Sequence, residues 1–279
     1  MKVAILLAAY NSQRYIDEQI CSILEQSYKD WVLYVRDDGS TDNTPNIIDS
    51  YSKQYPNKIR LIKDENKGLG AYHNFLHLLY CVDAEYYFFS DHDDVWLPNK
   101  IELSVNKMIK AVEKYSNDIP LLVFSDMKVV DESLNIINES FWKYSKLLPK
   151  HVKFEELVFC NSVNGCTIMI NNKVKELSKA NIAYCSMHDM LTAQTVAANR
   201  GVLLRIDEPT VLYRQHSNNA IGASNVDKKY IWGKLIQPFN RFRVFLNITK
   251  SKNHILKVPF YRYVFYKMEV VILRFFRVF

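Results

Sequence analysis

The sequence "YYFFSDHDDVWLP" (residues 86–98) sets four aromatic residues just before three carboxylates, Asp91, Asp93 and Asp94. A continuous apolar run of this kind is typical of a strand that is buried on both faces. Carboxylates this close repel one another, and each raises the pKa of its neighbours. A divalent cation such as Mg²⁺ or Mn²⁺ would remove that repulsion, because its preferred ligands are carboxylate oxygens. A short D-x-D motif taken alone is nevertheless more often a solvated acidic turn.

The chain before this stretch alternates between apolar runs and helical patterns. The predicted strands are 2–9, 31–38, 59–65 and the run ending at Ser90, and the helices between them are 12–27, 44 onward and 69–82. This alternation predicts an α/β fold with a mostly parallel sheet flanked by helices. In such sheets ligands bind beyond the carboxyl ends of the strands. Both acidic clusters, "RDDGS" (36–40) and "SDHDD" (90–94), are predicted to lie there.

The first of these clusters continues as "DDGSTDNT" (37–44). Asp37 and Asp38 follow a strand, Gly39 permits a tight turn, and small polar residues then cap the next helix. The segment can be read simply as a strand-to-helix turn. Two acidic strand ends in one parallel sheet can also converge on one ligand, with one carboxylate at a base or ribose and another at a metal.

The pattern loosens after a helix that begins near Pro98. Further strands are predicted at 120–126, 166–170, 201–207 and 210–216, and a helix at 187–199. The small polar stretch 217–225 then marks a boundary. We therefore expect a catalytic domain at 1–224 and a tail at 225–279.

The tail differs sharply in charge from the rest of the chain. Residues 221–279 hold 12 Lys and Arg against two acidic residues, whereas residues 1–220 hold 24 basic and 28 acidic ones. Placed on a helix, 257–279 has a mainly cationic sector opposite an aromatic and aliphatic side. This pattern predicts a basic amphipathic helix that lies on an anionic membrane surface. Docking on the catalytic body and an oligomer contact are the alternatives, and a nucleic-acid partner is not expected.

Cysteines and hydropathy indicate the compartment. The five cysteines show no C-x-x-C spacing, which argues for reduced thiols and against a disulfide framework or a zinc site. Neither a signal peptide nor an uncharged run of spanning length is recognised. We expect a cytoplasmic protein that is peripheral on the inner face of the membrane.

Several ordered motifs carry a resemblance to a known family. "LLAAYNSQRYIDEQICSILEQSYKDWVLYVRDDGSTDNT", "NKGLGAYHNF" and "YYFFSDHDDVWLPNKI" resemble family 2 nucleotide-sugar glycosyltransferases of the GT-A fold. "FSDMKVVDESLNII", "NSVNGCTIMINNKV", "MHDMLTAQTVAANRG" and "VLYRQHSNNAIGAS" are similar to the bacterial rhamnosyltransferase-like branch. The resemblance covers roughly residues 2–224. It is specific for fold and reaction class and much less so for the sugar.

The resemblance implies roles for individual residues. Asp189, in "HDML" (188–191), matches the catalytic base, although it could also be a carboxylate that stabilises a helix N-terminus. Asp93 would bind the metal, Mn²⁺ or Mg²⁺, together with His216, which could equally be a buried, hydrogen-bonded histidine. Asp94 and Arg214 would support the diphosphate. The nucleotide would contact Ala9, Tyr10, Asn11, Asp38, Lys67, Gly68, Asn74 and Asp91, and the acceptor would lie beside Gly165, Cys166 and His188.

The predicted function is inverting transfer of a sugar from a nucleoside diphosphate donor to a growing, lipid-linked bacterial surface polysaccharide. By resemblance, dTDP-rhamnose is the first choice of donor, with UDP-glucose, UDP-galactose or UDP-N-acetylhexosamine as alternatives. A nucleotidyltransferase would need a Gly-rich basic loop after its first strand, and "AAYNSQRY" (8–15) is not one. A non-catalytic, membrane-associated scaffold is the remaining alternative.

Overall fold

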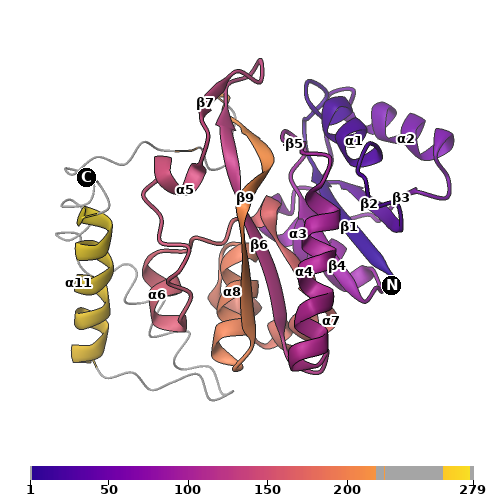
Figure 1. Ribbon diagram of the computed structural model, residues 1–279. Coiled ribbons are helices and arrows are strands. Elements are labelled where there is room, and N and C mark those ends of the chain that lie inside the picture. Colours follow the sequence, from indigo (N-terminus) through magenta and orange to yellow (C-terminus); the bar gives the residue numbers. More distant parts are fainter. Residues whose placement is uncertain (1, 218–222, 224–259, 277–279) are drawn as a thin grey trace.

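The computed structural model describes residues 2–217, 223 and 260–276 (Figure 1). Strands and helices alternate through its first part, as the sequence predicts. The elements are β1 (Val3–Ala9), α1 (Ile16–Leu24), β2 (Trp31–Asp37), α2 (Thr44–Gln54), β3 (Ile59–Leu61), α3 (Gly70–Cys81) and β4 (Tyr86–Ser90).

The second part of the chain mixes short and long elements. They are β5 (Val95–Trp96), α4 (Lys100–Tyr115), β6 (Leu121–Val130), β7 (Ile136–Asn138), α5 (Phe141–Tyr144), α6 (Phe154–Phe159), the 3₁₀ turn η1 (Gly165–Thr167), β8 (Met169–Asn171), α7 (Asn172–Ser178), the 3₁₀ segment η2 (Lys179–Tyr184), α8 (His188–Ala198), β9 (Val202–Arg214) and α11 (Phe260–Phe276).

One sheet in the order β3-β2-β1-β4-β8-β6-β9-β5 forms the centre of the molecule, and β7 pairs with β6. Strands β3, β2, β1 and β4 are parallel, β8 is antiparallel to both of its neighbours, and β9 runs parallel to β6. Every residue of β1 and β4 is buried, which explains their unbroken apolar sequences. Helices α3 and α4 pack against β1 and β6. The ends of β1, β2 and β4 therefore share one edge of the sheet, where both acidic clusters lie.

Two strand predictions in the second part are wrong in detail. Segments 201–207 and 210–216 form one strand, β9, in spite of Pro209. The register between β6 and β9 shifts on both sides of the pair Asp126 and Pro209, and the extra residues lie in β9 itself, so the proline sits at an irregularity of its own strand. The predicted strand at 166–170 starts instead as the turn η1, in which the carbonyl of Asn164 accepts from the backbone N–H of Thr167 at 2.9 Å and from its hydroxyl at 2.7 Å.

The C-terminal helix α11 lies at one side of the molecule, next to α6 (Figure 1). Tyr266, Val270 and Leu273 pack in a small apolar cluster with residues of α6. Arg274, from the predicted cationic sector, donates to the backbone oxygens of Ser145 at 2.9 Å and Lys146 at 3.0 Å. Arg274 therefore faces the body of the protein. The predicted boundary near residue 224 and most of the tail lie outside the described residues.

Among the described residues, the longest and most apolar helices still fall short of what is needed to cross a bilayer.

Candidate active site

The acidic loop after β4 meets the end of β9. The imidazole Nε2 of His216 lies 2.9 Å from Oδ2 of Asp93, and the backbone N–H of Arg214 donates to Oδ1 of Asp94 at 3.2 Å. Strand β5, which follows the acidic loop directly, pairs with β9 and aligns the two segments. The His216 ring also stacks on Tyr15, with ring centroids 4.7 Å apart. The structure thus brings together the predicted metal pair, Asp93 and His216.

Arg214, predicted to support the diphosphate, directs its guanidinium at protein groups. Its Nε donates to the backbone oxygen of Asp93 at 2.8 Å, and its Nη1 to the backbone oxygen of Glu132 at 2.6 Å. Nη2 forms an ion pair with Glu18, and the guanidinium carbon lies 4.8 Å from the centre of the Tyr15 ring. Arg214 thus fixes the backbone of the loop that carries Asp93. Its contact with a diphosphate stays a prediction.

The donor set of this loop suits a hard divalent cation. Ligand atoms of Asp91, Asp94 and Cys166 lie within 4.8 Å of one another. Burial, with the charge of Asp93, raises the pKa of Asp94 well above its usual value, and burial with Asp93 and Asp189 raises the pKa of Asp91 to about 7. Oδ2 of Asp94 is buried without a hydrogen-bond partner in the described part of the chain. Carboxylates that repel one another in this way fit a bound Mg²⁺ or Mn²⁺.

Cys166, predicted on the acceptor side, lies inside the protein. It is buried, and its Sγ lies 3.3 Å from the sulfur of Met127. Burial, followed by the charge of Asp94, raises the pKa of the thiol well above its usual value. A protonated thiol is a poor ligand and nucleophile, so the carboxylate oxygens suit a metal better than this thiol does. The contact of Cys166 with an acceptor stays a prediction.

Lys100 is a buried cation beneath the same loop, and the sequence analysis did not identify it. Its Nζ donates to the backbone oxygen of Cys166 at 2.8 Å and lies 4.6 Å from the Trp96 ring centre. Burial lowers its pKa to about 8. Lys100 therefore attaches η1 to α4 and places a positive charge near Asp94. The negative charge of Asp94 in turn acts to raise the pKa of Lys100.

Asp189 lies in the first turn of α8, where its carboxylate is partly buried. Its Oδ1 accepts from the backbone N–H of Met190 at 2.6 Å. Burial raises its pKa to about 6, and its charge in turn contributes to the raised pKa of Asp91. A carboxylate with this pKa is ionised at neutral pH and can accept a proton. The predicted base therefore lies close enough to Asp91 for the two charges to interact.

Its neighbour His188 points into the core instead. The ring lies between Phe75 and Phe89, with centroids at 4.1 and 4.8 Å, and burial lowers its pKa to about 3. A Cβ added at Gly165 would lie 2.3 Å from His188 Nε2, so this glycine is required by the close approach of the ring. The predicted acceptor-side residues Gly165 and His188 thus contact each other, and their contact with an acceptor stays a prediction.

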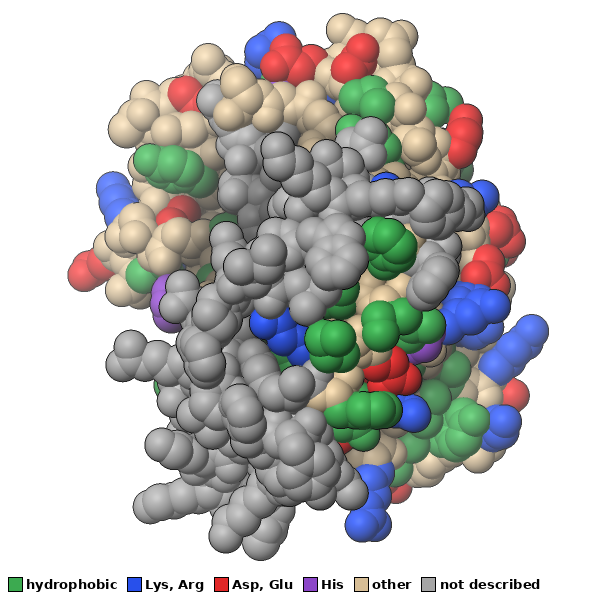
Figure 2. Space-filling model, turned by 90° about the vertical axis from the view of Figure 1, so that its left-hand side faces the viewer, with side chains coloured by type: hydrophobic (Ala, Val, Ile, Leu, Met, Phe, Trp, Pro, Cys, Tyr) green, Lys and Arg blue, Asp and Glu red, His purple; other side chains and the backbone are tan. Residues whose placement is uncertain are grey.

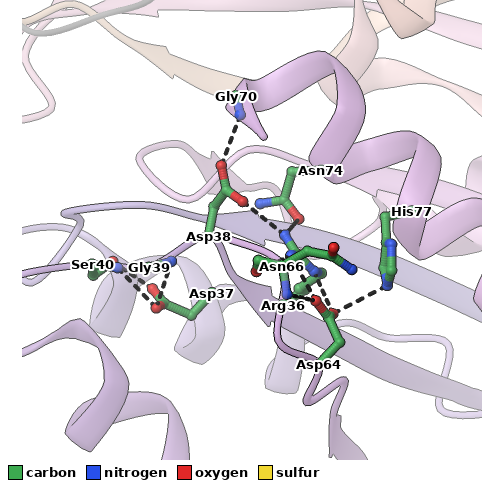
Figure 3. Close-up of polar contacts among 10 residues, drawn as sticks. All are labelled: Arg36, Asp37, Asp38, Gly39, Ser40, Asp64, Asn66, Gly70, Asn74 and His77. Carbon is green, nitrogen blue, oxygen red and sulfur yellow. Dashed lines mark hydrogen bonds and ion pairs between the residues drawn. The ribbon is translucent and has the colours of Figure 1, made fainter. Parts of the chain in front are cut away.

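The other acidic cluster forms a separate polar network at the end of β2 (Figure 3). Oδ1 of Asp38 accepts from Arg36 Nη1 at 2.9 Å, and Oδ2 accepts from the backbone N–H of Gly70 at 2.8 Å. Oδ1 of Asn74 accepts from the same Arg36 nitrogen at 2.9 Å. Two residues predicted to contact the nucleotide, Asp38 and Asn74, therefore accept hydrogen bonds from the same guanidinium group.

The remaining predicted nucleotide residues surround this network. Asn11 has φ of 45°, and its Oδ1 accepts from the backbone N–H of Thr41 at 2.9 Å. Tyr10 is 51% exposed, which leaves an aromatic face available for stacking. The carbonyl of Ala9 accepts from the N–H of Asp38, and the carbonyl of Asp38 from the N–H of Gly68, both at 2.9 Å, and the side chain of Lys67 lies over Gly39. The structure gathers all of these residues at the ends of β1 and β2.

The fold and the site together define a class of protein. Its members have an α/β sheet whose carboxyl edge carries acidic groups, and this arrangement suits the binding of a nucleoside diphosphate donor. A family model described as Glycosyl transferase family 2 matches residues 4–165. The chain is 32% identical to the dTDP-rhamnosyl transferase RfbG of Shigella flexneri over 230 residues, which cover 78% of this chain and 74% of that protein. The chain belongs to glycosyl transferase family 2, and it is a glycosyltransferase similar to the rhamnosyltransferase branch.

Solved structures share its fold at low sequence identity. The structure of S. aureus TarS 1–349 in complex with UDP-GlcNAc matches with a TM-score of 0.61 at 16% identity, covering 99% of this chain and 72% of that one. The mannosyltransferase PcManGT from Pyrobaculum calidifontis, in complex with GDP-Man and Mn²⁺, matches with a TM-score of 0.57 at 15% identity, covering 99% and 71%. The predicted GT-A fold, family and enzyme class are confirmed.

Proposed function

We propose that the protein transfers L-rhamnose, with inversion, from dTDP-rhamnose to a growing lipid-linked surface polysaccharide. The observation that supports the reaction is the electrostatic interaction of Asp189 with Asp91, in the same acidic loop whose Asp93 pairs with His216. The donor rests on the likeness to the Shigella flexneri dTDP-rhamnosyl transferase. UDP-hexoses and UDP-N-acetylhexosamines are the alternative donors. Membership of a family of enzymes argues against a purely scaffolding role for this protein.

In this proposal, residues of the chain handle the acceptor proton and the donor. Asp189 takes the proton of the acceptor hydroxyl as its oxygen attacks the anomeric carbon, in a single displacement that inverts that carbon. Asp38, Asn74 and Tyr10 hold the base, and Asp91 faces the ribose. Asp93 and His216, with Asp94 in support, would hold Mg²⁺ or Mn²⁺, which when bound stabilises negative charge on the departing diphosphate.

A donor screen tests the reaction. Purified full-length protein is incubated with acceptor lipid, Mn²⁺ or Mg²⁺, and each of dTDP-rhamnose, UDP-glucose, UDP-galactose and UDP-N-acetylglucosamine, and nucleoside diphosphate release is measured. We expect release from dTDP-rhamnose above all, and its loss in Asp189→Asn. Nucleotide release from a UDP-sugar alone would show that this sugar nucleotide, and not dTDP-rhamnose, is the donor. Release from none of the four would overturn the proposed function.

The C-terminal helix supports a membrane location for this reaction. Docking on α6 turns the opposite, apolar side of α11 outward, and Phe265, Met268 and Ile272 are 63%, 42% and 46% exposed. Figure 2 shows hydrophobic side chains gathered on that face of the molecule. Residues 221–279 carry 12 basic against two acidic residues, which complements an anionic lipid surface. We infer that α11 lies on the inner face of the membrane, where a lipid-linked acceptor would be found.

Liposome co-sedimentation tests this location. Full-length protein is expected to pellet with vesicles that contain anionic lipid, and a variant with Phe265→Ser and Ile272→Ser to pellet less. A matched control carries Ile136→Ser and Ile137→Ser on β7, which are 51% and 48% exposed and distant in sequence from α11. Equal pelleting of all three proteins would contradict the proposal.

A further inference from the structure

Arg36 is the residue directly before the acidic pair of β2, and its side chain is almost wholly buried, at 1% exposure. All five of its N–H groups are used. Nε and Nη2 donate to the two carboxylate oxygens of Asp64 at 2.8 and 3.0 Å, and Nη2 also donates to the backbone oxygen of Asn66 at 2.6 Å. Nη1 donates to Asp38 and Asn74, both at 2.9 Å. A planar guanidinium can hold four partners in this way, whereas a lysine ammonium cannot reproduce the fork.

This guanidinium connects three parts of the chain (Figure 3). It joins the end of β2 to the loop 64–70 and to α3. The loop is fixed further by N–H groups of Gly68 and Gly70, which donate to the backbone and the carboxylate of Asp38. Both glycines have positive φ, 68° and 76°, so the loop depends on residues that tolerate that conformation. On the far side, His77 Nε2 lies 3.1 Å from Asp64.

The contacts of Arg36 also fix what the base subsite can offer. An ionised Asp38 is only an acceptor, and each of its oxygens keeps lone pairs beyond the bonds to Arg36 and Gly70. The oxygen of Asn74 faces Arg36, so its amide group presents N–H donors to other groups. Because both side chains bind the same nitrogen, an acceptor and a donor lie side by side. Uracil, thymine and guanine offer an N–H next to a carbonyl oxygen, whereas cytosine offers the reverse order.

We propose that Arg36, held by Asp64, is a positioning residue that orients Asp38 and Asn74 so that the donor subsite selects a base carrying an N–H beside a carbonyl. This inference rests on the proposed nucleotide-sugar donor. Among the contacts described, Asp64 bonds Arg36, the backbone of its own loop and His77. Of these partners, Arg36 is the one that bonds both Asp38 and Asn74.

Calorimetric titration of the full-length protein with dTDP, UDP and CDP in the presence of Mg²⁺ tests the proposal. The variants are Asp64→Asn and Arg36→Lys. The control is Arg205→Lys, which alters another strand arginine paired with an aspartate, Asp207 at 2.8 Å. In wild type and control we expect dTDP and UDP to bind at least about tenfold more tightly than CDP. In both variants dTDP should bind about tenfold more weakly, and the preference over CDP should shrink.

The outcomes separate this inference from the function on which it rests. A wild type that binds none of the three nucleotides overturns the proposed function as well. A wild type that prefers dTDP, with a preference that Asp64→Asn leaves unchanged, overturns the role of Arg36 alone. Equal weakening of dTDP and CDP in the variants indicates general damage to the pocket and also contradicts the proposal. Should Arg36→Lys fail to fold, Asp64→Asn decides the matter, because Asp64 is partly exposed and the change preserves its size.

Discussion

Replacing Gly165 with alanine should damage both the fold and the reaction. The added Cβ would lie 2.3 Å from Nε2 and 2.7 Å from Cε1 of His188, more than an ångström short of an ordinary contact of 3.4 Å to Nε2. The ring cannot retreat, because Phe75 and Phe89 lie on it. Overpacking of this kind costs about 1–3 kcal/mol of the free energy of unfolding. For a chain of this size each kcal/mol lowers Tm by about 2–4 °C.

Gly165→Ala should also lower the catalytic rate, because His188 directly precedes the predicted base Asp189 in the first turn of α8 and would displace it. A displacement of a catalytic group by about 1 Å can reduce kcat about 10²-fold. Gly201→Ala is the matched control, because its Cβ would lie 2.3 Å from the backbone oxygen of Pro120, away from the site. We expect a similar fall in Tm for Gly201→Ala with unchanged kcat.

Urea unfolding and nucleotide-release kinetics measure both effects. Adding His188→Ala to Gly165→Ala removes the clash, so the double variant should be more stable than the sum of the two single changes predicts. Stability effects that add to within about 0.5 kcal/mol would refute the contact. So would a Gly165→Ala protein with the Tm and kcat of wild type.

Three further predictions concern single groups. Asp189→Asn should lower kcat by about 10²–10⁴-fold, and in wild type log(kcat/KM) should rise with pH until about 6, where the base is ionised; a flat profile through this range would contradict the assignment. Mn²⁺ should raise the Tm of wild type and raise it far less in His216→Ala, whose pair with Asp93 is lost; equal shifts in a thermal scan would exclude His216 as a ligand. Arg36 holds the pKa of Asp64 well below its usual range. The pair therefore adds stability above about pH 4 that is lost as pH falls, and the difference in urea midpoint between wild type and Asp64→Asn should narrow on acidification.

The first part of the fold could be predicted because two of its strands, β1 and β4, are buried along their whole length. Runs such as Val3–Ala9 and Tyr86–Ser90 are continuous and apolar, and amphipathic helices separate them. The second part resisted prediction because its elements are short and mixed. Strand β5 has two residues, and Pro209 lies inside β9 at a point where that strand holds extra residues and its register with β6 shifts.

Motifs in the sequence located the predicted metal and base residues but not the side chains that position them. Asp93, His216 and Asp189 were found by their order along the chain, and Asp93 and His216 meet at 2.9 Å. Arg36 and Lys100 were missed, although Arg36 directly precedes an acidic pair at a strand end and Lys100 begins the helix after β5. A buried position for such a cation depends on partners far along the chain, such as the carbonyl of Cys166, and no local pattern reports them. Gly165 was predicted to lie beside the acceptor, and only the three-dimensional structure shows that the His188 ring is what approaches it.

The pairing of β5 with β9 has a consequence for synthesis on the ribosome. Asp93 is made 123 residues before its partner His216. The residues of the proposed base subsite, at the ends of β1 and β2, have all been made once α3 has been made, so the Arg36 network can form as the chain emerges. The acidic loop can pair with His216, and accept the hydrogen bond from Arg214 to Asp94, only after β9 has been synthesised. A nascent chain should therefore acquire nucleotide binding well before it acquires the means to use a donor.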